Sequence, residues 1–194
     1  AEKLRRIDDI GGPDSHSNFP HGWAMASHTP LRRYKQNTHG GGIRDPFVMT
    51  WPKKIVAKGE VRHQFVHACD LTPTLLDLIG IAPPAEIGGV AQMPLEGESF
   101  ARSITDPSAP SKSSPQYFEM FGHRGIWHDG WKAVSFHPSG TPFENDKWEL
   151  FHLAKDFSET DDLAAQEPER LEAMIPGEAR QLTPALSSPQ DGRY

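Results

Sequence analysis

Cysteine is almost absent from this sequence, which holds one cysteine, Cys69, among 194 residues. An internal disulfide is therefore impossible within it, and its folding does not require an oxidising compartment. Cys69 lies in "VHACDLTPTLLDLIG", beside the start of an expected helix. This position favours a small buried apolar side chain over a reactive thiol.

Long hydrophobic runs and an excess of basic residues are also lacking. No apolar run approaches the length of a membrane span, and the first residues, "AEKLRRIDDIGG", lack the apolar core of a signal peptide. We therefore expect no membrane partner and no signal peptide in this stretch. The sequence does not indicate the cellular compartment of the protein. The formal net charge of -6 argues against a nucleic-acid partner, because such proteins need a basic face.

Proline and glycine, by contrast, are plentiful, with 18 and 17 residues, and they predict many loops and short elements. The first twelve residues predict a short helix that ends at Gly11 and Gly12. Residues 13–30 are expected to form a loop. The run "PFVMTWP", residues 46–52, predicts a buried strand, and residues 53–68 predict a polar connector that can hold an edge strand.

The clearest helix is predicted in "DLTPTLLDLIGIAPP". Thr72 is a suitable N-cap, Pro73 suits the first helical position, and Gly80 is expected to end the helix after Ile79. A strand followed by a helix indicates an α/β layer. A short helix is also expected in "LEGESFARSITDP".

A connector rich in Pro and Ser, residues 106–115, predicts a boundary between two units, residues 1–108 and 109–194. In the second unit, Asp129-Gly130 between alternating apolar and polar residues predicts a β-hairpin. A further strand is expected from Trp148 to Leu153, and a terminal helix near Pro168. Residues 183–194 are expected to be irregular.

Several segments, in order, resemble the C-terminal portion of a type I (formylglycine-dependent) sulfatase. They are "TPLRRYKQNTHGGGIRDPFVMTWP", "HACDLTPTLLDLIGI", "LEGESF", "YFEMFGHRGIWHDGWKAV" and "WELFHLAKDFSETDDLA". The family, the arylsulfatases, belongs to the alkaline-phosphatase-like superfamily. The resemblance implies an α/β fold: the end of a large mixed-sheet catalytic domain, followed by a small α+β module with a four-stranded antiparallel sheet and a packed helix.

The resemblance also implies a reaction, the hydrolysis of sulfate monoesters by a formylglycine hydrate, with a divalent cation, usually Ca²⁺, held by Asp and Asn. Lys35 stands where the family's "YK…GG-x-R-x-P" block places a sulfate-binding lysine, so it is the candidate catalytic and substrate-binding residue. His39 is the second candidate for substrate binding. The three glycines, 40–42, would let the backbone pass closely under the pocket. Arg44 is expected to pair with a carboxylate.

The sequence also departs from the family pattern. It contains no C/S-x-P-x-R motif for the formylglycine, no "DN-G" pair for the cation, and Cys69 is followed by "DLTP". None of the Ca²⁺ ligands and no formylglycine precursor are therefore expected in this chain. We expect these residues alone to be inactive and either poorly soluble or partly disordered, and to need the N-terminal part of the catalytic domain as a partner.

Other polar residues favour structural roles. His63 and His67 have the spacing of one helix face, but they lack a third ligand for zinc. Asp161 and Asp162 are expected in a solvated turn and at a helix cap. A further set in the second unit is expected mainly in the core of a small sheet: His123, Arg124, Trp127, His128 and Trp131.

Two alternatives to a sulfatase fragment stay open. One is a phosphodiesterase or phosphonate-monoester hydrolase of the same superfamily, because the pocket residues that choose the substrate are expected upstream. The other is a truncated, non-catalytic protein with a binding or structural role.

Overall fold

A computed structural model describes residues 2–15, 18, 20–56, 59–112 and 114–175. The helices and strands in this part of the chain are short. They are α1 (Glu2–Arg5), η1 (Ile7–Asp9), α2 (His21–His28), α3 (Gly40–Ile43), η2 (Ala68–Asp70), α4 (Leu71–Ile79), β1 (Glu86–Ile87), β2 (Val90–Ala91), α5 (Ala101–Thr105), β3 (Gln116–Met120), β4 (His123–His128), β5 (Trp131–Ser135), η3 (Phe143–Asn145), β6 (Trp148–His152) and α6 (Pro168–Met174).

The largest element of structure is a four-stranded antiparallel sheet in the order β3-β4-β5-β6. The predicted hairpin is confirmed: Asp129 and Gly130 join β4 to β5 with φ values of 47° and 76°, and His128 pairs with Trp131. Positive φ at both central residues is the geometry that an Asp-Gly pair favours in a two-residue hairpin. The expected strand at Trp148 is also confirmed as β6.

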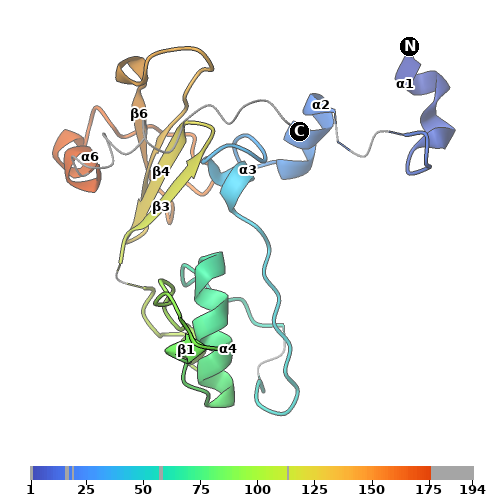
Figure 1. Cartoon of the computed structure of the whole chain (residues 1–194). Helices are drawn as coiled ribbons and strands as arrows, with labels where there is room; N and C mark the ends of the chain where they lie inside the picture. The colour runs from blue at the N-terminus through green and yellow to red at the C-terminus, as the bar shows by residue number, and fades with distance from the viewer. Residues whose placement is uncertain (1, 16–17, 19, 57–58, 113, 176–194) are drawn as a thin grey trace.

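One face of this sheet holds the hydrophobic core. Ile126, Ala133 and Leu150 are neighbours across β4, β5 and β6, so their side chains share a face. Helix α6, the terminal helix expected near Pro168, covers this face with Met174, and Ile175 directly after the helix also packs there. In Figure 1, α6 lies beside the sheet, next to β6.

The opposite face of the sheet is also buried, and it is more polar. Trp127, Lys132 and Phe151 are cross-strand neighbours on this face, each shifted by one residue from the core row. Phe65 stacks on Trp127 with ring centroids 3.8 Å apart. Lys132 is 2% exposed, which is unusual for an unpaired lysine and therefore points to a charged partner.

Two predictions for the first half of the chain are wrong. Residues 21–28, expected in a loop, form α2, with the Pro20 carbonyl accepting a hydrogen bond from the Ala24 amide. The strand expected in residues 46–52 is absent: this described stretch has no regular structure, and Val48 is 88% exposed. An apolar run forms a strand only beside another strand, and the described residues supply none here.

Helix α4 confirms the predicted helix, with one difference at its start. It begins at Leu71 rather than after Thr72, and the Thr74 hydroxyl donates to the Asp70 carbonyl at 2.6 Å. Gly80 ends it in the left-handed conformation, at φ 71°, as expected. The short helix expected near residue 101 is confirmed as α5.

Helix α4 and the β1-β2 hairpin form a group beneath the four-stranded sheet (Figure 1). Two connecting segments, one after α3 and one before β3, join this group to the sheet. None of the helices in the described residues is long and apolar enough to cross a membrane. The stretch 183–194, expected to be irregular, lies outside the described residues.

Candidate active site

Lys35 lies at the tip of a tight turn. The Asn37 amide donates to the Tyr34 carbonyl at 3.2 Å, and Gln36 has a φ of 74°, so Tyr34 to Asn37 form a β-turn with Lys35 as its second residue. Lys35 and Gln36 are exposed, whereas Asn37 is buried. The Asn37 side-chain amide donates back to the Tyr34 carbonyl at 3.1 Å. The turn therefore has a fixed base and presents Lys35 outward.

The three glycines form a single helical turn, α3, directly behind this β-turn. A Cβ atom on Gly41 would lie 2.1 Å from the Arg33 carbonyl oxygen, and one on Gly42 would lie 2.0 Å from that of Asn37. The Gly41 amide donates to the Arg32 carbonyl at 2.8 Å. The predicted close passage is confirmed in its geometry, but what the glycines approach is the chain's own backbone at residues 32–37.

The segment between the turn and the glycines lies on the polar face of the sheet. The Thr38 hydroxyl donates to the Arg124 carbonyl at 2.9 Å, and Gly125 leaves room for Thr38, because a Cβ there would lie 3.1 Å from the Thr38 Cβ. His39 is fully buried, and its Nε2 lies 3.1 Å from Glu149 Oε2. Glu149 is on β6, so both contacts tie this segment to the sheet.

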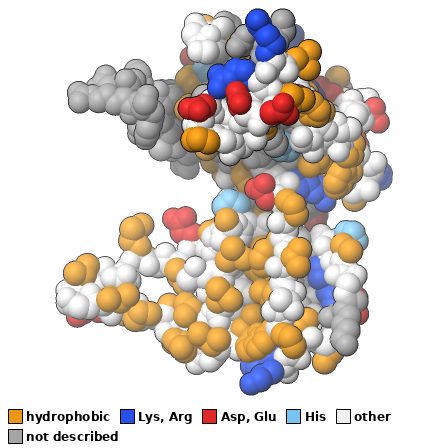
Figure 2. All heavy atoms as spheres, turned by 90° about the vertical axis from the view of Figure 1, so that its right-hand side faces the viewer, with side chains coloured by type: hydrophobic (Ala, Val, Ile, Leu, Met, Phe, Trp, Pro, Cys, Tyr) orange, Lys and Arg blue, Asp and Glu red, His pale blue; other side chains and the backbone are white. Residues whose placement is uncertain are grey.

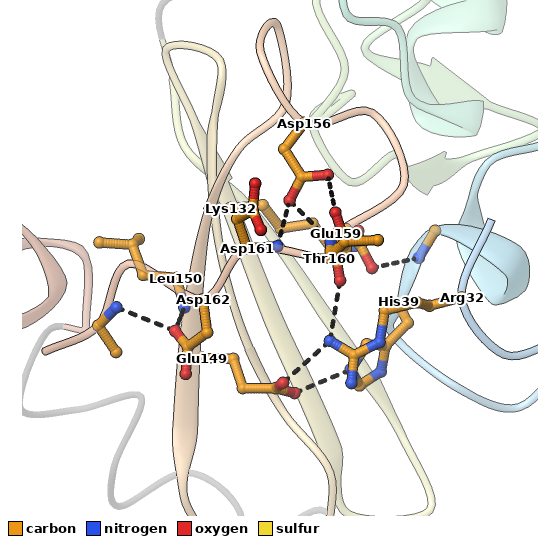
Figure 3. A network of polar contacts seen from close by, with 12 residues as sticks. Arg32, His39, Lys132, Glu149, Leu150, Asp156, Glu159, Thr160, Asp161 and Asp162 are labelled. Carbon is orange, nitrogen blue, oxygen red and sulfur yellow. Dashed lines mark hydrogen bonds and ion pairs between the residues drawn. The ribbon is translucent and has the colours of Figure 1, made fainter. Parts of the chain in front are cut away.

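A buried ion pair holds the first glycine. Lys132 Nζ on β5 lies 2.5 Å from Glu159 Oε1, and the Gly40 amide donates to Glu159 Oε2 at 2.9 Å. Arg32 donates to Glu149 Oε1 at 2.9 Å and to the Glu159 carbonyl at 3.0 Å. Figure 3 shows these side chains between the sheet and the segment that carries Arg32 and His39.

Burial sets the charge state of this network. Desolvation lowers the pKa of His39 from 6.5 to about 4, against the opposing effect of Glu149, so the ring is neutral near pH 7. Its Nε2–H can then donate to the Glu149 carboxylate. Burial alone would raise the pKa of Glu149, but its hydrogen bonds with Arg32 and His39 lower it overall, so the carboxylate stays charged.

A cavity of about 270 Å³ lies between the turn and β3. The turn side is lined by Gln36, Asn37 and Thr38, and the strand side includes Tyr117 and Glu119. Asn37 Oδ1 is buried without a hydrogen-bond partner among the described residues. A polar group of this kind needs a partner, so a ligand or further protein atoms would be stabilised there.

The other residues considered from sequence have structural contacts. The Arg44 guanidinium, expected to pair with a carboxylate, lies over the Phe157 ring at 4.0 Å. The Asp162 carboxylate accepts the Leu150 and Ala164 amides rather than capping a helix. Cys69 is part-buried, 2.9 Å from His67 Nδ1, and burial raises the pKa of its thiol, which disfavours the reactive thiolate.

No group of three or more His, Cys, Asp or Glu side chains suited to a metal ion occurs in the part of the chain that the structure describes. The described residues therefore offer no set of side chains that fits a metal ion.

The residues that hold the loop were missed in the sequence. Lys132 and Glu149 come from strands, and Glu159 comes from the turn after β6, far from the loop in the chain. One signal was present: Lys132 occupies the same face as Trp127 and Phe151, where an uncharged residue is expected. Only the fold shows that Glu159 is its partner.

Residues 34–182 match the family described as N-sulphoglucosamine sulphohydrolase, C-terminal. The chain is 30% identical over 181 residues to the N-acetylgalactosamine-6-sulfatase of Canis lupus familiaris, a match covering 84% of this chain and 34% of that protein. It is 26% identical over 171 residues to a sulfatase of Schizosaccharomyces pombe, covering 87% of this chain and 30% of that protein. The chain thus spans about a third of the length of these relatives.

A solved structure has a similar fold. The crystal structure of Ps i-CgsB in complex with k-i-k-neocarrahexaose has 27% sequence identity and a TM-score of 0.59, and the match covers 79% of this chain and 32% of that chain. Sequence and structure therefore agree on which part of the relatives this chain resembles.

Proposed function

Because the chain belongs to the sulfatase family, matching its N-sulphoglucosamine sulphohydrolase C-terminal region, we propose that it forms the C-terminal part of an enzyme that hydrolyses sulfate monoesters. The division expected near residue 108 separates the end of the catalytic α/β domain from the small module that carries the four-stranded sheet. The relatives named as sulfatases support the reaction type.

Lys35 is the residue of this chain that we propose acts on the substrate. The observation that carries this is the exposed ammonium at the tip of a turn whose base is tied to the sheet. An ammonium has three donors and a compact charge, which suit one oxygen of a sulfuryl group or the departing ester oxygen. Charge stabilisation of this kind is a large contribution to catalysis.

The nucleophile and the cation must come from elsewhere in the protein under this proposal. We infer that a formylglycine and Ca²⁺ belong to the part of the relatives that this chain does not span. A direct contact between His39 and the substrate stays a prediction. The buried ring of His39 and its bond to Glu149 support an indirect role, through the loop that it holds.

Lys35→Ala tests the proposal in a longer, active form of the protein. Turnover of p-nitrophenyl sulfate should fall by about a hundredfold or more, as it does when a charge-stabilising group is lost. Lys155→Ala is the matched control, because Lys155 is also exposed but lies beyond β6. Near-normal turnover in Lys35→Ala would remove Lys35 from the site. Faster cleavage of a phosphodiester than of the sulfate ester would favour a phosphodiesterase.

A further inference from the structure

We propose that Glu159, paired with Lys132, is a positioning residue that sets the placement of Lys35 through the Gly40 amide. The inference rests on the proposed function of Lys35 and extends it to a part of the sheet that does not touch the substrate.

Lys132 and Glu159 form a buried ion pair. Lys132 and Glu159 are 2% and 1% exposed, so each would be costly to bury alone. Their atoms lie 2.5 Å apart, and the attraction offsets part of the cost of removing both from water. A pair of this kind gives little net stability, so stability alone does not explain its presence here.

The two carboxylate oxygens of Glu159 have different partners. Glu159 Oε1 faces Lys132, whereas Oε2 accepts the Gly40 amide at 2.9 Å. Glu159 also has a φ of 57°, in the left-handed region that few non-glycine residues adopt. A glutamate held in this conformation and paired on both oxygens has one orientation available to it.

Backbone contacts connect Gly40 to the turn that carries Lys35. Gly41 and Gly42 follow directly, with no room for a side chain: Gly41 lies against the carbonyl groups of Arg32 and Arg33, and Gly42 against those of Tyr34 and Asn37. The Arg32 guanidinium also donates to the Glu159 carbonyl at 3.0 Å, so both sides of the loop meet at Glu159. A shift of Gly40 must therefore displace the turn that carries Lys35. Displacements of about 1 Å at a catalytic group can cost a hundredfold in rate.

Two double variants separate positioning from general stability. Lys132→Met/Glu159→Gln removes both charges but keeps an oxygen that can accept the Gly40 amide. Lys132→Met/Glu159→Met has side chains of similar length and no acceptor. Replacing both partners of a buried pair with uncharged side chains is tolerated far better than removing one. The two variants therefore differ mainly in the hydrogen bond to Gly40.

Hydrogen exchange in the 194-residue chain gives the first readout. We expect the amides of residues 40–42 to exchange about tenfold faster or more in the Met/Met variant than in the Met/Gln variant, because a lost hydrogen bond of ordinary strength is worth about that factor. The amides of Ile126, Ala133 and Leu150, in the core row of the sheet, should exchange equally in both. Equal exchange at residues 40–42 would overturn the proposal.

Turnover of p-nitrophenyl sulfate by the longer, active form gives the second readout. The Met/Met variant should lose about tenfold or more in kcat relative to Met/Gln, with a smaller change in KM. Equal kcat values, with Lys35→Ala inactive, would overturn the proposal. If Lys35→Ala is fully active while the exchange difference persists, the proposed function of Lys35 fails and the loop contact stands.

Discussion

A buried lysine and a buried histidine on one sheet face are the least ordinary residues of this protein. Lys132 meets a carboxylate, whereas His39 is kept neutral and bonds to Glu149. A buried charge costs free energy unless it pairs with an opposite charge or the group is neutral. Lys132 is an example of the first case, and His39 is an example of the second. The difference predicts which of them responds to pH.

His39 should make the protein less stable in acid. Its pKa is lowered from 6.5 to about 4 by burial, so the unfolded chain binds a proton that the folded chain does not between these values. The contribution of neutral, buried His39 to the free energy of unfolding is therefore complete above pH 6.5. It is lost as the pH drops toward 4, and the loss is on the order of 3 kcal/mol.

His39→Gln tests this effect, because the glutamine amide can still donate to Glu149 but does not titrate. Urea unfolding, followed by tryptophan fluorescence, gives the free energy of unfolding at pH 7 and at pH 5. The decrease in this free energy from pH 7 to pH 5 should be smaller in the variant than in the unchanged protein. Carboxylates such as Glu149 titrate in both proteins and cancel in the comparison. An equal loss in both proteins would show that His39 is not buried as a neutral ring.

At the scale of elements, the close contact between α3 and the Lys35 turn decides the conformation of α3. Gly41 lies so near the Arg32 and Arg33 carbonyls that any side chain must move backbone. The element is thus a helix turn only because its residues are glycines, which otherwise disfavour helices. Its conformation depends on the surrounding contacts.

Gly41→Ala should destabilise the protein by about 2 kcal/mol or more, because a clash with backbone cannot be relieved by a rotamer change. Gly22→Ala is the matched control: Gly22 lies in α2, with nothing within 4 Å of its Cβ position. That change should be neutral or stabilise by up to about 1 kcal/mol. Chemical denaturation of the two variants measures the contrast, and equal stabilities would contradict the packing described for Gly41.

Elements were predictable from the sequence where local signals were sufficient. The hairpin at Asp129-Gly130 and the end of α4 at Gly80 were both expected, because each depends on a residue that tolerates positive φ. The strand expected at residues 46–52 failed, since a strand also needs a neighbour that the local sequence does not report. Helix α2 was not predicted, because Pro13, Pro20 and Pro30 favoured a loop in this stretch.

At the scale of the whole molecule, apolar side chains spread over the lower group of elements. Figure 2 shows them across that face, and Leu75, Ile79, Ile87, Val90 and Met93 are all more than half exposed. A surface of this kind on a soluble protein usually meets another protein surface. Under the function proposed above, this surface is expected to pack against the rest of the catalytic domain.

Leu75→Glu should therefore have opposite effects in two contexts. In the 194-residue chain alone it should reduce self-association and the binding of a hydrophobic dye. In a longer form that includes the rest of the proposed catalytic domain, it should destabilise the protein by about 2 kcal/mol, the cost of exposing one buried leucine. Thr72→Glu, at another exposed position of α4, is the control. The same direction of effect in both contexts would contradict a covered face.

The sequence by itself determined the family resemblance, the candidate Lys35, the hairpin and the helix at α4, because each follows from residues close together in the chain. Only the tertiary structure decided how Lys35 is held. Glu149 and Glu159 are more than a hundred residues from His39 and Gly40, and a carboxylate far away in the chain gives no local pattern. Folding brings these groups together, because a polar group removed from water needs a hydrogen-bond or charged partner inside the protein.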